Sequence, residues 1–145
     1  MIEQVKQWLY ASPAVKAMIQ ESAKLDYGRA IITGWAAQLA QHAPAGSAFT
    51  VLDIGCGKGD DLLSVRSRIT GRQVSLYGLD CVPSQLAALQ GRGITASAID
   101  IEHNRFPFSD QMFDLVICNQ IIEHTKEIFW IFSEFSRILT EGGHL

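Results

Sequence analysis

Apolar positions along the chain follow two spacings, and the spacing changes at glycines and prolines. Short continuous apolar runs predict buried strands, whereas apolar residues three or four positions apart predict helices that cover the strands. Strand, helix and strand in succession predict a parallel unit. The pattern predicts strand 49–54, helix 60–69, strand 74–79, helix 83–91, strand 94–99, strand 112–118, a helix capped by Thr125 and ended by Gly142-Gly143, and a fifth strand that starts at His144.

Residues 1–45 have a helical pattern and differ in character from the rest of the chain. Apolar stripes recur at helical spacing, and residues 42–47 form a linker with proline and glycine. We therefore expect an N-terminal helical segment over 1–45 and a second part over 46–145. The stripes comprise Val5, Trp8, Leu9, then Val15, Met18, Ile19, then Ile31, Ile32, Trp35, Leu39 and Ala40.

Composition narrows the class of protein. The chain has 145 residues, 48% of them hydrophobic, and a net charge of -3. One globular domain is expected, and the absence of a strongly basic balance argues against a dedicated nucleic-acid binder. The N-terminus lacks a basic segment followed by an apolar run, and no stretch of about 18 apolar residues occurs. We expect a cytoplasmic protein without a membrane partner.

The cysteines and histidines show no metal-site spacing. Cys56, Cys81 and Cys118 lie in or beside apolar strand segments, so they are expected to be free, buried thiols in a reducing compartment. The remaining histidines are scattered, and we expect no metal site. They are His42, His103 and His144.

A glycine-rich turn comes after the first strand and is the centre of the predicted site. Gly55, Gly57 and Gly59 alternate with other residues, and Asp53 stands two positions before the first of them. This spacing matches neither the dinucleotide fingerprint nor the phosphate loop. An acid at this place suits a ligand with an ammonium or sulfonium cation. The alternative is a glycine turn kept only for tight packing.

The segment 52–59, Leu-Asp-Ile-Gly-Cys-Gly-Lys-Gly, resembles the first motif of the class I methyltransferases that use S-adenosylmethionine. The resemblance implies a three-layer, Rossmann-like parallel sheet, here incomplete with four strands and the start of a fifth, after an N-terminal helical extension. It implies S-adenosyl-L-methionine as cofactor and S-adenosyl-L-homocysteine as product. Asp53, Gly55, Cys56 and Gly57 are then expected to contact the cofactor.

The end of the second strand supports the same ligand. Asp80 lies 21 positions after Gly59, about where an acid accepts hydrogen bonds from a ribose. The resemblance implies that Asp80 binds both ribose hydroxyls and that Cys81 lies against the adenine. Alternatively, Asp80 is the N-cap of the helix that starts at Pro83. The two roles are compatible.

After the third strand, the resemblance implies that the Asp100 carboxylate binds the exocyclic amine of adenine. The backbone N–H of Ile101 would meet a ring nitrogen. Glu102 takes the carboxylate role if the register of the loop differs. The alternative is an ordinary acidic turn.

Residues 106–124 resemble the fourth-strand region of small-molecule methyltransferases, which leads into a Glu-His pair. The Asn119 carbonyl is expected to frame the methionine part of the cofactor. His124 is the candidate catalytic base, because an imidazole titrates near neutral pH. Alternatively, His124 is a helix-start residue bonded to Glu123 or to the backbone. Glu123 itself is either a solvated acid or a ligand of the acceptor.

We therefore expect a methyltransferase that acts on a small-molecule or other acceptor. The alternative is a catalytically silent module that binds S-adenosylmethionine and acts as a regulatory or structural partner. The glycine spacing and Asp53 disfavour a nicotinamide oxidoreductase. Tyr27 and Arg29 would either reach the ligand or lie at the surface of a helix junction.

The fourth strand is expected to be an exposed apolar edge, which a dimer or a partner chain would cover unless the chain is a fragment.

Overall fold

The computed structural model describes residues 26–89 and 91–145. The chain divides into two compact units, Met1–Ile32 and Thr33–Leu145, and the sheet belongs to the second. Helix α3 (Asp26–His42) begins in the first unit and ends in the second. The helices predicted over residues 1–25 and the side chain of Tyr27 lie outside the described residues. The predicted role of Arg29 and the predicted division near residue 45 stay predictions.

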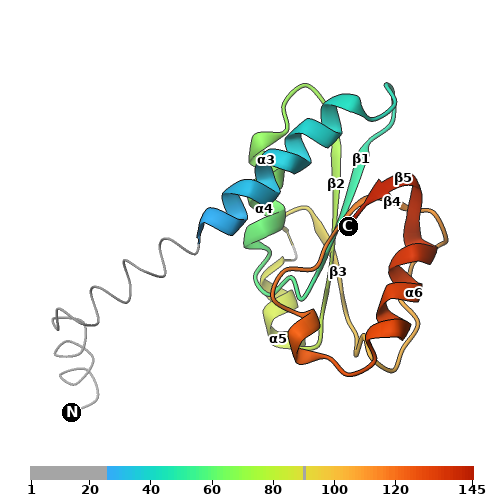
Figure 1. Ribbon diagram of the computed structural model, residues 1–145. Coiled ribbons are helices and arrows are strands. Elements are labelled where there is room, and N and C mark those ends of the chain that lie inside the picture. The colour runs from blue at the N-terminus through green and yellow to red at the C-terminus, as the bar shows by residue number, and fades with distance from the viewer. Residues whose placement is uncertain (1–25, 90) are drawn as a thin grey trace, which may run out of the picture. The chain divides into compact units, whose positions relative to one another are not determined.

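Five parallel strands form one sheet, with β1 in the middle and the order β3-β2-β1-β4-β5 (Figure 1). This arrangement confirms the predicted Rossmann-like parallel sheet. The carboxyl ends of all five strands lie at one edge of the sheet, because parallel strands share a direction. The strands are β1 (Phe49–Ile54), β2 (Val74–Asp80), β3 (Ile94–Ala98), β4 (Phe113–Ile117) and β5 (Leu139–His144).

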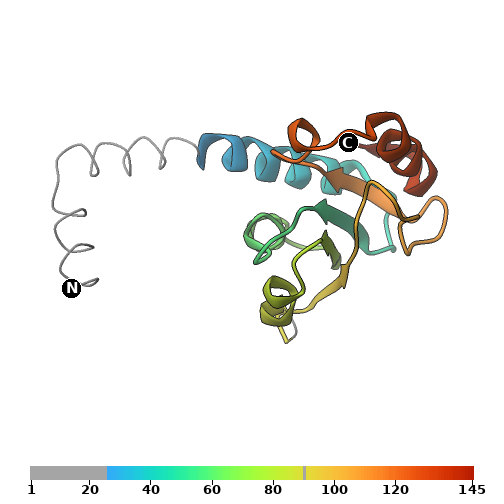
Figure 2. The same ribbon diagram turned by 90° about the horizontal axis from the view of Figure 1, so that it is seen from below.

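Helices cover both faces of this sheet. Helices α4 (Asp60–Arg68) and α5 (Pro83–Leu86) lie on one face, and α6 (Ile128–Ile138) lies on the other (Figures 1 and 2). Short 3-10 turns, η1 (Ala87–Leu89) and η2 (Ile122–His124), come after α5 and β4. In the part of the chain that the structure describes, no helix is both long and apolar enough to cross a membrane.

The core beneath α6 shows why the strands are apolar on both faces. Leu52 and Ile54 on β1 point to the same side because side chains alternate along a strand, and both join the cluster under α6. Val51, which precedes Leu52 and points the other way, is also fully buried. The other buried members of the cluster are Leu79, Phe106, Phe113, Val116, Ile131, Phe135 and Ile138.

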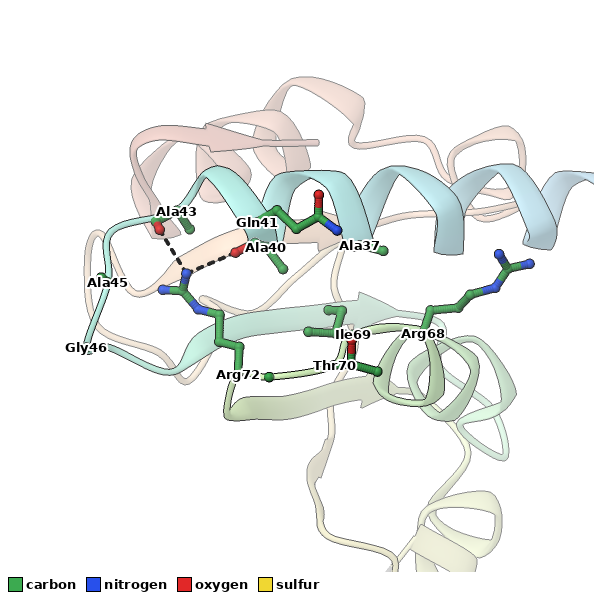
Figure 3. Close-up of a pocket in the computed structure, with 11 residues that line it drawn as sticks. Ala37, Ala40, Gln41, Ala43, Ala45, Gly46, Arg68, Ile69, Thr70 and Arg72 are labelled. Carbon is green, nitrogen blue, oxygen red and sulfur yellow. Dashed lines mark hydrogen bonds between the residues drawn. The ribbon is translucent and has the colours of Figure 1, made fainter.

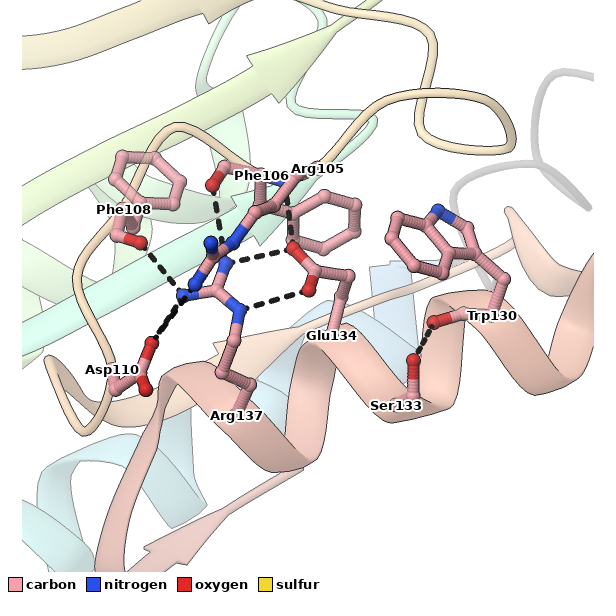
Figure 4. A network of polar contacts seen from close by, with 8 residues as sticks. All are labelled: Arg105, Phe106, Phe108, Asp110, Trp130, Ser133, Glu134 and Arg137. Atoms are coloured by element: carbon pink, nitrogen blue, oxygen red, sulfur yellow. Dashed lines mark hydrogen bonds and ion pairs between the residues drawn. The ribbon is translucent and has the colours of Figure 1, made fainter.

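An ion pair between the buried Glu134 and the half-buried Arg137 fastens the turn before β4 to α6 (Figure 4). Arg137 donates from Nε to Oε1 of Glu134 (2.8 Å) and from Nη2 to Oε2 of Glu134 (2.7 Å). Its guanidinium also donates to the carbonyls of Phe106 (3.1 Å) and Phe108 (2.8 Å) and to Oδ1 of Asp110 (2.8 Å). The Phe106 backbone N–H donates to Oε2 of Glu134 (2.7 Å). The network thus holds the turn through both N–H and carbonyl groups of its backbone.

Stability should fall in acid because of this network. Hydrogen bonds from Arg137 hold the pKa of Glu134 below its ordinary value of 4.5. A carboxyl whose pKa is depressed on folding stabilises the protein above its unfolded pKa, and this contribution is lost as the pH falls through the lower, folded pKa. We expect the free energy of unfolding to drop below about pH 4.5, measured by urea titrations across pH. In Glu134→Gln the drop should be smaller, and an identical pH profile would contradict the assignment.

Four expectations about the C-terminal elements and the sheet edge were wrong. Helix α6 ends at Ile138 rather than at Gly142-Gly143, because Leu139 is already extended and pairs with Phe113 in the sheet. For the same reason the fifth strand starts at Leu139, and His144 is its last residue. Thr125 does not cap α6, since its hydroxyl donates to the Ile122 carbonyl (2.9 Å). The fourth strand is not an edge, because β5 pairs with it.

Candidate functional site

The glycine turn leaves β1 and starts α4 at the carboxyl edge of the sheet. The backbone N–H groups of Gly55 and Cys56 both donate to the Leu79 carbonyl of β2, at 2.7 and 3.0 Å. Gly55, Gly57 and Gly59 have φ values of 74°, 51° and 78°, which residues with side chains rarely adopt. The predicted strand, turn and helix are therefore present, and the turn is fastened to the neighbouring strand.

Tight packing accounts for two of the three glycines. A Cβ at Gly59 would lie 2.7 Å from Cδ2 of Leu89 and 2.9 Å from Cδ1 of Ile94, inside the core on the α4 side. At Gly55 a Cβ would instead meet Cδ1 of Ile121 at 2.1 Å, and Gly55 is exposed. The packing alternative thus fits both Gly59 and Gly55, although Gly55 is also exposed backbone, beneath a side chain from the loop after β4.

Gly57 also presents bare backbone, and Asp80 holds it. Its backbone N–H donates to Oδ2 of Asp80 (2.9 Å), while Oδ1 accepts from the Val82 backbone N–H (2.9 Å). A Cβ at Gly57 would lie 3.0 Å from Oε1 of Gln85. Val82, not Asp80, is the N-cap residue of α5. Each carboxylate oxygen has a further lone pair, so Asp80 can position the turn and still accept hydrogen bonds from a ligand.

Asp53 supplies negative charge behind the turn. Asp53 is 4% exposed. The pKa of the Cys56 thiol is raised to about 12, first by the burial of the thiol and second by the negative charge of Asp53. Burial and then Asp53 likewise raise the pKa of Cys118 to about 12. The negative charge of Asp53 therefore acts both on the glycine turn after β1, where Cys56 lies, and on the residue after β4, Cys118. The same potential that disfavours thiolates favours a cationic ligand group.

The cysteines differ in exposure. Cys56 is buried, and Gly78 makes room for it, because a Cβ there would lie 2.5 Å from Sγ of Cys56. Cys118 is half-buried, whereas Cys81 is exposed, so the expectation of three buried thiols was wrong for Cys81. Cys81 comes directly after the last residue of β2, where the chain leaves the core.

In the ranges 26–89 and 91–145, no group of three or more His, Cys, Asp or Glu could hold a metal ion.

The turn after β3 orients the Asp100 carboxylate. Oδ1 of Asp100 accepts from the Glu102 backbone N–H (3.0 Å), and Oδ2 lies 2.8 Å from Nδ1 of His103. The hydrogen bond with His103 lowers the pKa of Asp100 and raises the pKa of His103. Ile101, the next residue along the chain after Asp100, is half-buried. The Glu102 side chain is bound elsewhere, to backbone N–H groups of Lys126 and Glu127. Which of the two acids meets the adenine stays a prediction.

The loop after β4 carries the predicted base and contacts the glycine turn through Ile121. Asn119 is exposed, and Gln120 has a positive φ of 57°. His124 is exposed at the end of η2, and its backbone N–H donates to the Ile121 carbonyl (2.9 Å). The Ile121 side chain in turn lies over Gly55. The segment with His124 is therefore next to the glycine turn.

Three residues at this edge were missed by the sequence prediction. Ile121 and Gln85 cover the glycine turn, and no local pattern marks either one. His103 pairs with Asp100, and the three-residue spacing of an acid and a histidine was an available signal. None of the three changes which residues are expected to meet the cofactor; that set stays a prediction.

A cavity of about 300 Å³ lies at the other end of the sheet (Figure 3). Its walls come from the end of α3, the linker before β1 and the loop before β2. Arg72 donates to the carbonyls of Ala40 (2.9 Å) and Ala43 (2.8 Å), and thus fixes the end of α3. Since these groups precede β1 and β2, the cavity is remote from the carboxyl edge of the sheet.

The comparisons with known proteins agree with this geometry. A family model described as a methyltransferase domain matches residues 51–143. The chain belongs to the class I methyltransferase family. The resemblance stated from the sequence is therefore confirmed, and the predicted enzyme and cofactor classes are those of the family.

Individual relatives of this methyltransferase chain are moderately similar. A demethylmenaquinone methyltransferase from Deinococcus radiodurans is 34% identical over 116 residues, which are 77% of this chain and 47% of the relative. The chain thus spans less than half of that protein.

Two solved structures share the fold. One, from Methanococcus maripaludis, is described as a putative S-adenosyl-L-methionine-dependent methyltransferase; it has 21% identity and a TM-score of 0.60, over 86% of this chain and 58% of its own. The other is an amino pentose methyltransferase from Micromonospora echinaspora, solved with S-adenosylmethionine bound. It has 23% identity and a TM-score of 0.60, over 84% and 52%.

Proposed function

We propose that this chain binds S-adenosylmethionine at the carboxyl edge of the sheet and supports transfer of its methyl group to a small-molecule acceptor. One observation carries the proposal: the glycine turn is fastened to Asp80 and backed by the buried Asp53. Bare backbone lets a ligand approach closely, and the two carboxylates match a ligand with hydroxyl donors and a cation.

The residues present fit each part of the cofactor. Gly55 and Gly57 would hold the methionine part with the Asn119 carbonyl, near the charge of Asp53. Asp80 would accept from the ribose hydroxyls. The remaining contacts would be to adenine, from Cys81, from the Asp100 carboxylate and from the Ile101 backbone N–H. Asp100 would act as a carboxylate, since the ordinary pKa of 3.8 is already far below neutral pH and the hydrogen bond with His103 lowers the pKa further.

Methyl transfer from a sulfonium requires few catalytic groups from the protein. S-adenosylmethionine supplies a methyl group on a sulfonium, and its departure leaves a neutral thioether. The chain therefore need only orient the acceptor, exclude water and, for a protic acceptor, remove a proton. Cys56 and Cys118 stay protonated near neutral pH, because their pKa values are raised to about 12, so neither thiolate competes for the methyl group.

The acceptor is proposed only as a small molecule. The relative from Deinococcus radiodurans acts, by its name, on demethylmenaquinone, and it extends well beyond the part that this chain matches. No specific observation in the described residues favours a catalytically silent module.

Calorimetric titration tests the proposal. We expect saturable binding of S-adenosylmethionine and S-adenosylhomocysteine and no binding of NAD. Absence of heat with both the donor and its demethylated product, in a protein shown to be folded, would refute the proposed function. Transfer of a labelled methyl group to candidate acceptors then separates an enzyme from a silent module.

His124→Ala should separate catalysis from cofactor binding. If His124 removes a proton from the acceptor, its loss should lower turnover by about 100-fold, the lower end of the range for general-base catalysis. The affinity for S-adenosylhomocysteine should stay within about twofold, because the residue is expected to meet the acceptor and not the cofactor. His42→Ala, in α3, is the matched control. Unchanged turnover in His124→Ala would remove this residue from the mechanism.

A further inference from the structure

We propose that Glu102 is a positioning residue that couples the adenine side of the site to the loop that carries His124. This inference rests on the proposed function, in which Asp100 meets the adenine. Its basis is a carboxylate that lies on the turn after β3 but bonds to the segment before α6, 24 and 25 residues further along the chain.

One end of the coupling is the turn itself. The Glu102 backbone N–H donates to Oδ1 of Asp100 (3.0 Å), so the position of Glu102 and the orientation of the Asp100 carboxylate depend on each other. The Asp100 carbonyl accepts from the Asn104 backbone N–H (3.1 Å), and Oδ2 of Asp100 contacts Nδ1 of His103 (2.8 Å). These bonds make residues 100–104 one compact unit.

The other end is the start of α6. Oε1 of Glu102 accepts from the backbone N–H groups of Lys126 and, at 3.1 Å, Glu127. Glu127 is the N-cap residue of α6 and makes no capping bond with its own side chain. The first N–H groups of a helix lack partners within the helix, and negative charge there is favourable. Glu102 therefore anchors the N-cap residue and the residue before it, and places a negative charge at the start of α6.

Only a short segment separates this bond from the predicted base. His124 precedes Lys126 by two residues, and its backbone N–H is bonded to Ile121, whose side chain lies over Gly55. The loop is thus held at both ends, by Ile121 against the glycine turn and by Glu102 against the adenine side. A ligand that orders the Asp100 turn should also order this loop, since both share one carboxylate.

The charges around Glu102 agree with an ionised carboxylate. The two backbone N–H groups are the main cause of its lowered pKa, and Asp100 opposes and His103 supports this shift. Ionisation at neutral pH makes both hydrogen bonds charge-assisted, and such bonds are shorter and stronger than neutral ones.

Amide hydrogen exchange and calorimetry on the parent chain, Glu102→Ala and Glu102→Gln test the coupling. Without ligand, we expect exchange at Lys126 and Glu127 to be about tenfold faster in Glu102→Ala, as expected for loss of charge-assisted bonds. S-adenosylhomocysteine should slow exchange over residues 121–127 in the parent but not in Glu102→Ala. The dissociation constant of S-adenosylhomocysteine should be about fivefold to tenfold higher for Glu102→Ala than for the parent, which is the size of a typical coupling between two sites.

Two further variants keep the test specific. Glu102→Gln retains an acceptor oxygen but no charge, so its values should fall between those of the parent and of Glu102→Ala. Glu141→Ala removes an exposed acid on β5 and should match the parent. If the parent binds S-adenosylhomocysteine and Glu102→Ala shows the parent's exchange and affinity, the coupling is wrong while the proposed function stands. If the folded parent binds none, the proposed function fails and the coupling with it.

Discussion

Arg137→Ala is expected to lower the free energy of unfolding by about 3 to 5 kcal/mol, because it leaves a buried carboxylate without its partner. The Glu134 side chain is 5% exposed and takes two hydrogen bonds from Arg137. The substitution also removes the donors to the Phe106 and Phe108 carbonyls, so the turn before β4 loses its main attachment to α6. Urea unfolding at pH 7 measures the loss.

Matched variants distinguish this buried network from a general effect of charge. Arg68→Ala removes an exposed arginine at the end of α4, and its effect should stay within about 0.5 kcal/mol. Arg137→Lys keeps the charge but not the two-pronged geometry, so it should recover only part of the stability. A loss below about 1 kcal/mol in Arg137→Ala, as for a surface ion pair, would contradict the described geometry.

Asp80→Ala is expected to raise the dissociation constant for S-adenosylhomocysteine by about 100-fold. Hydrogen bonds to a charged group contribute about 1.5 to 3 kcal/mol each, and each 1.4 kcal/mol is tenfold in affinity. Asp80 is proposed to accept two bonds from the ribose. It also holds the Gly57 and Val82 backbone N–H groups, so its loss should loosen the glycine turn as well. Calorimetry measures the affinity and thermal unfolding checks the fold.

Two controls accompany this measurement. Asp80→Asn keeps one acceptor oxygen and should lose less affinity than Asp80→Ala. Asp60→Ala removes an exposed acid in the first turn of α4 and should change affinity by less than about twofold. An Asp80→Ala variant that is folded and binds like the parent would show that the ribose lies elsewhere.

The turn at residues 106–108, which opens the segment that resembles small-molecule methyltransferases, has a structural role in the core. Phe108 packs its ring edge-on against Tyr77 and Phe113, with centroids 5.9 and 4.8 Å apart. Phe106 is buried in the cluster under α6. The Phe-Pro-Phe turn is therefore a core element, and it fixes where β4 and the loop after it begin.

The sequence by itself determined the first four strands, the glycine turn and the acids at the strand ends. These features depend on neighbouring residues: the apolar run of β1 predicted its bounds, and glycines two positions apart predicted a turn. The end of α6 was mispredicted because a glycine pair resembles a helix stop, whereas pairing of Leu139 with Phe113 decided the outcome.

Only the tertiary structure decided which distant groups meet. Glu102 bonds to the start of α6. Arg137 reaches a turn 27 to 31 residues away. At the opposite end of the sheet, the Thr50 backbone N–H donates to Asp114, 64 positions on, at 2.8 Å, which explains an acid in an otherwise apolar strand. Such partners depend on strand order and on how helices lie over the sheet, and neither is encoded in the spacing of nearby residues.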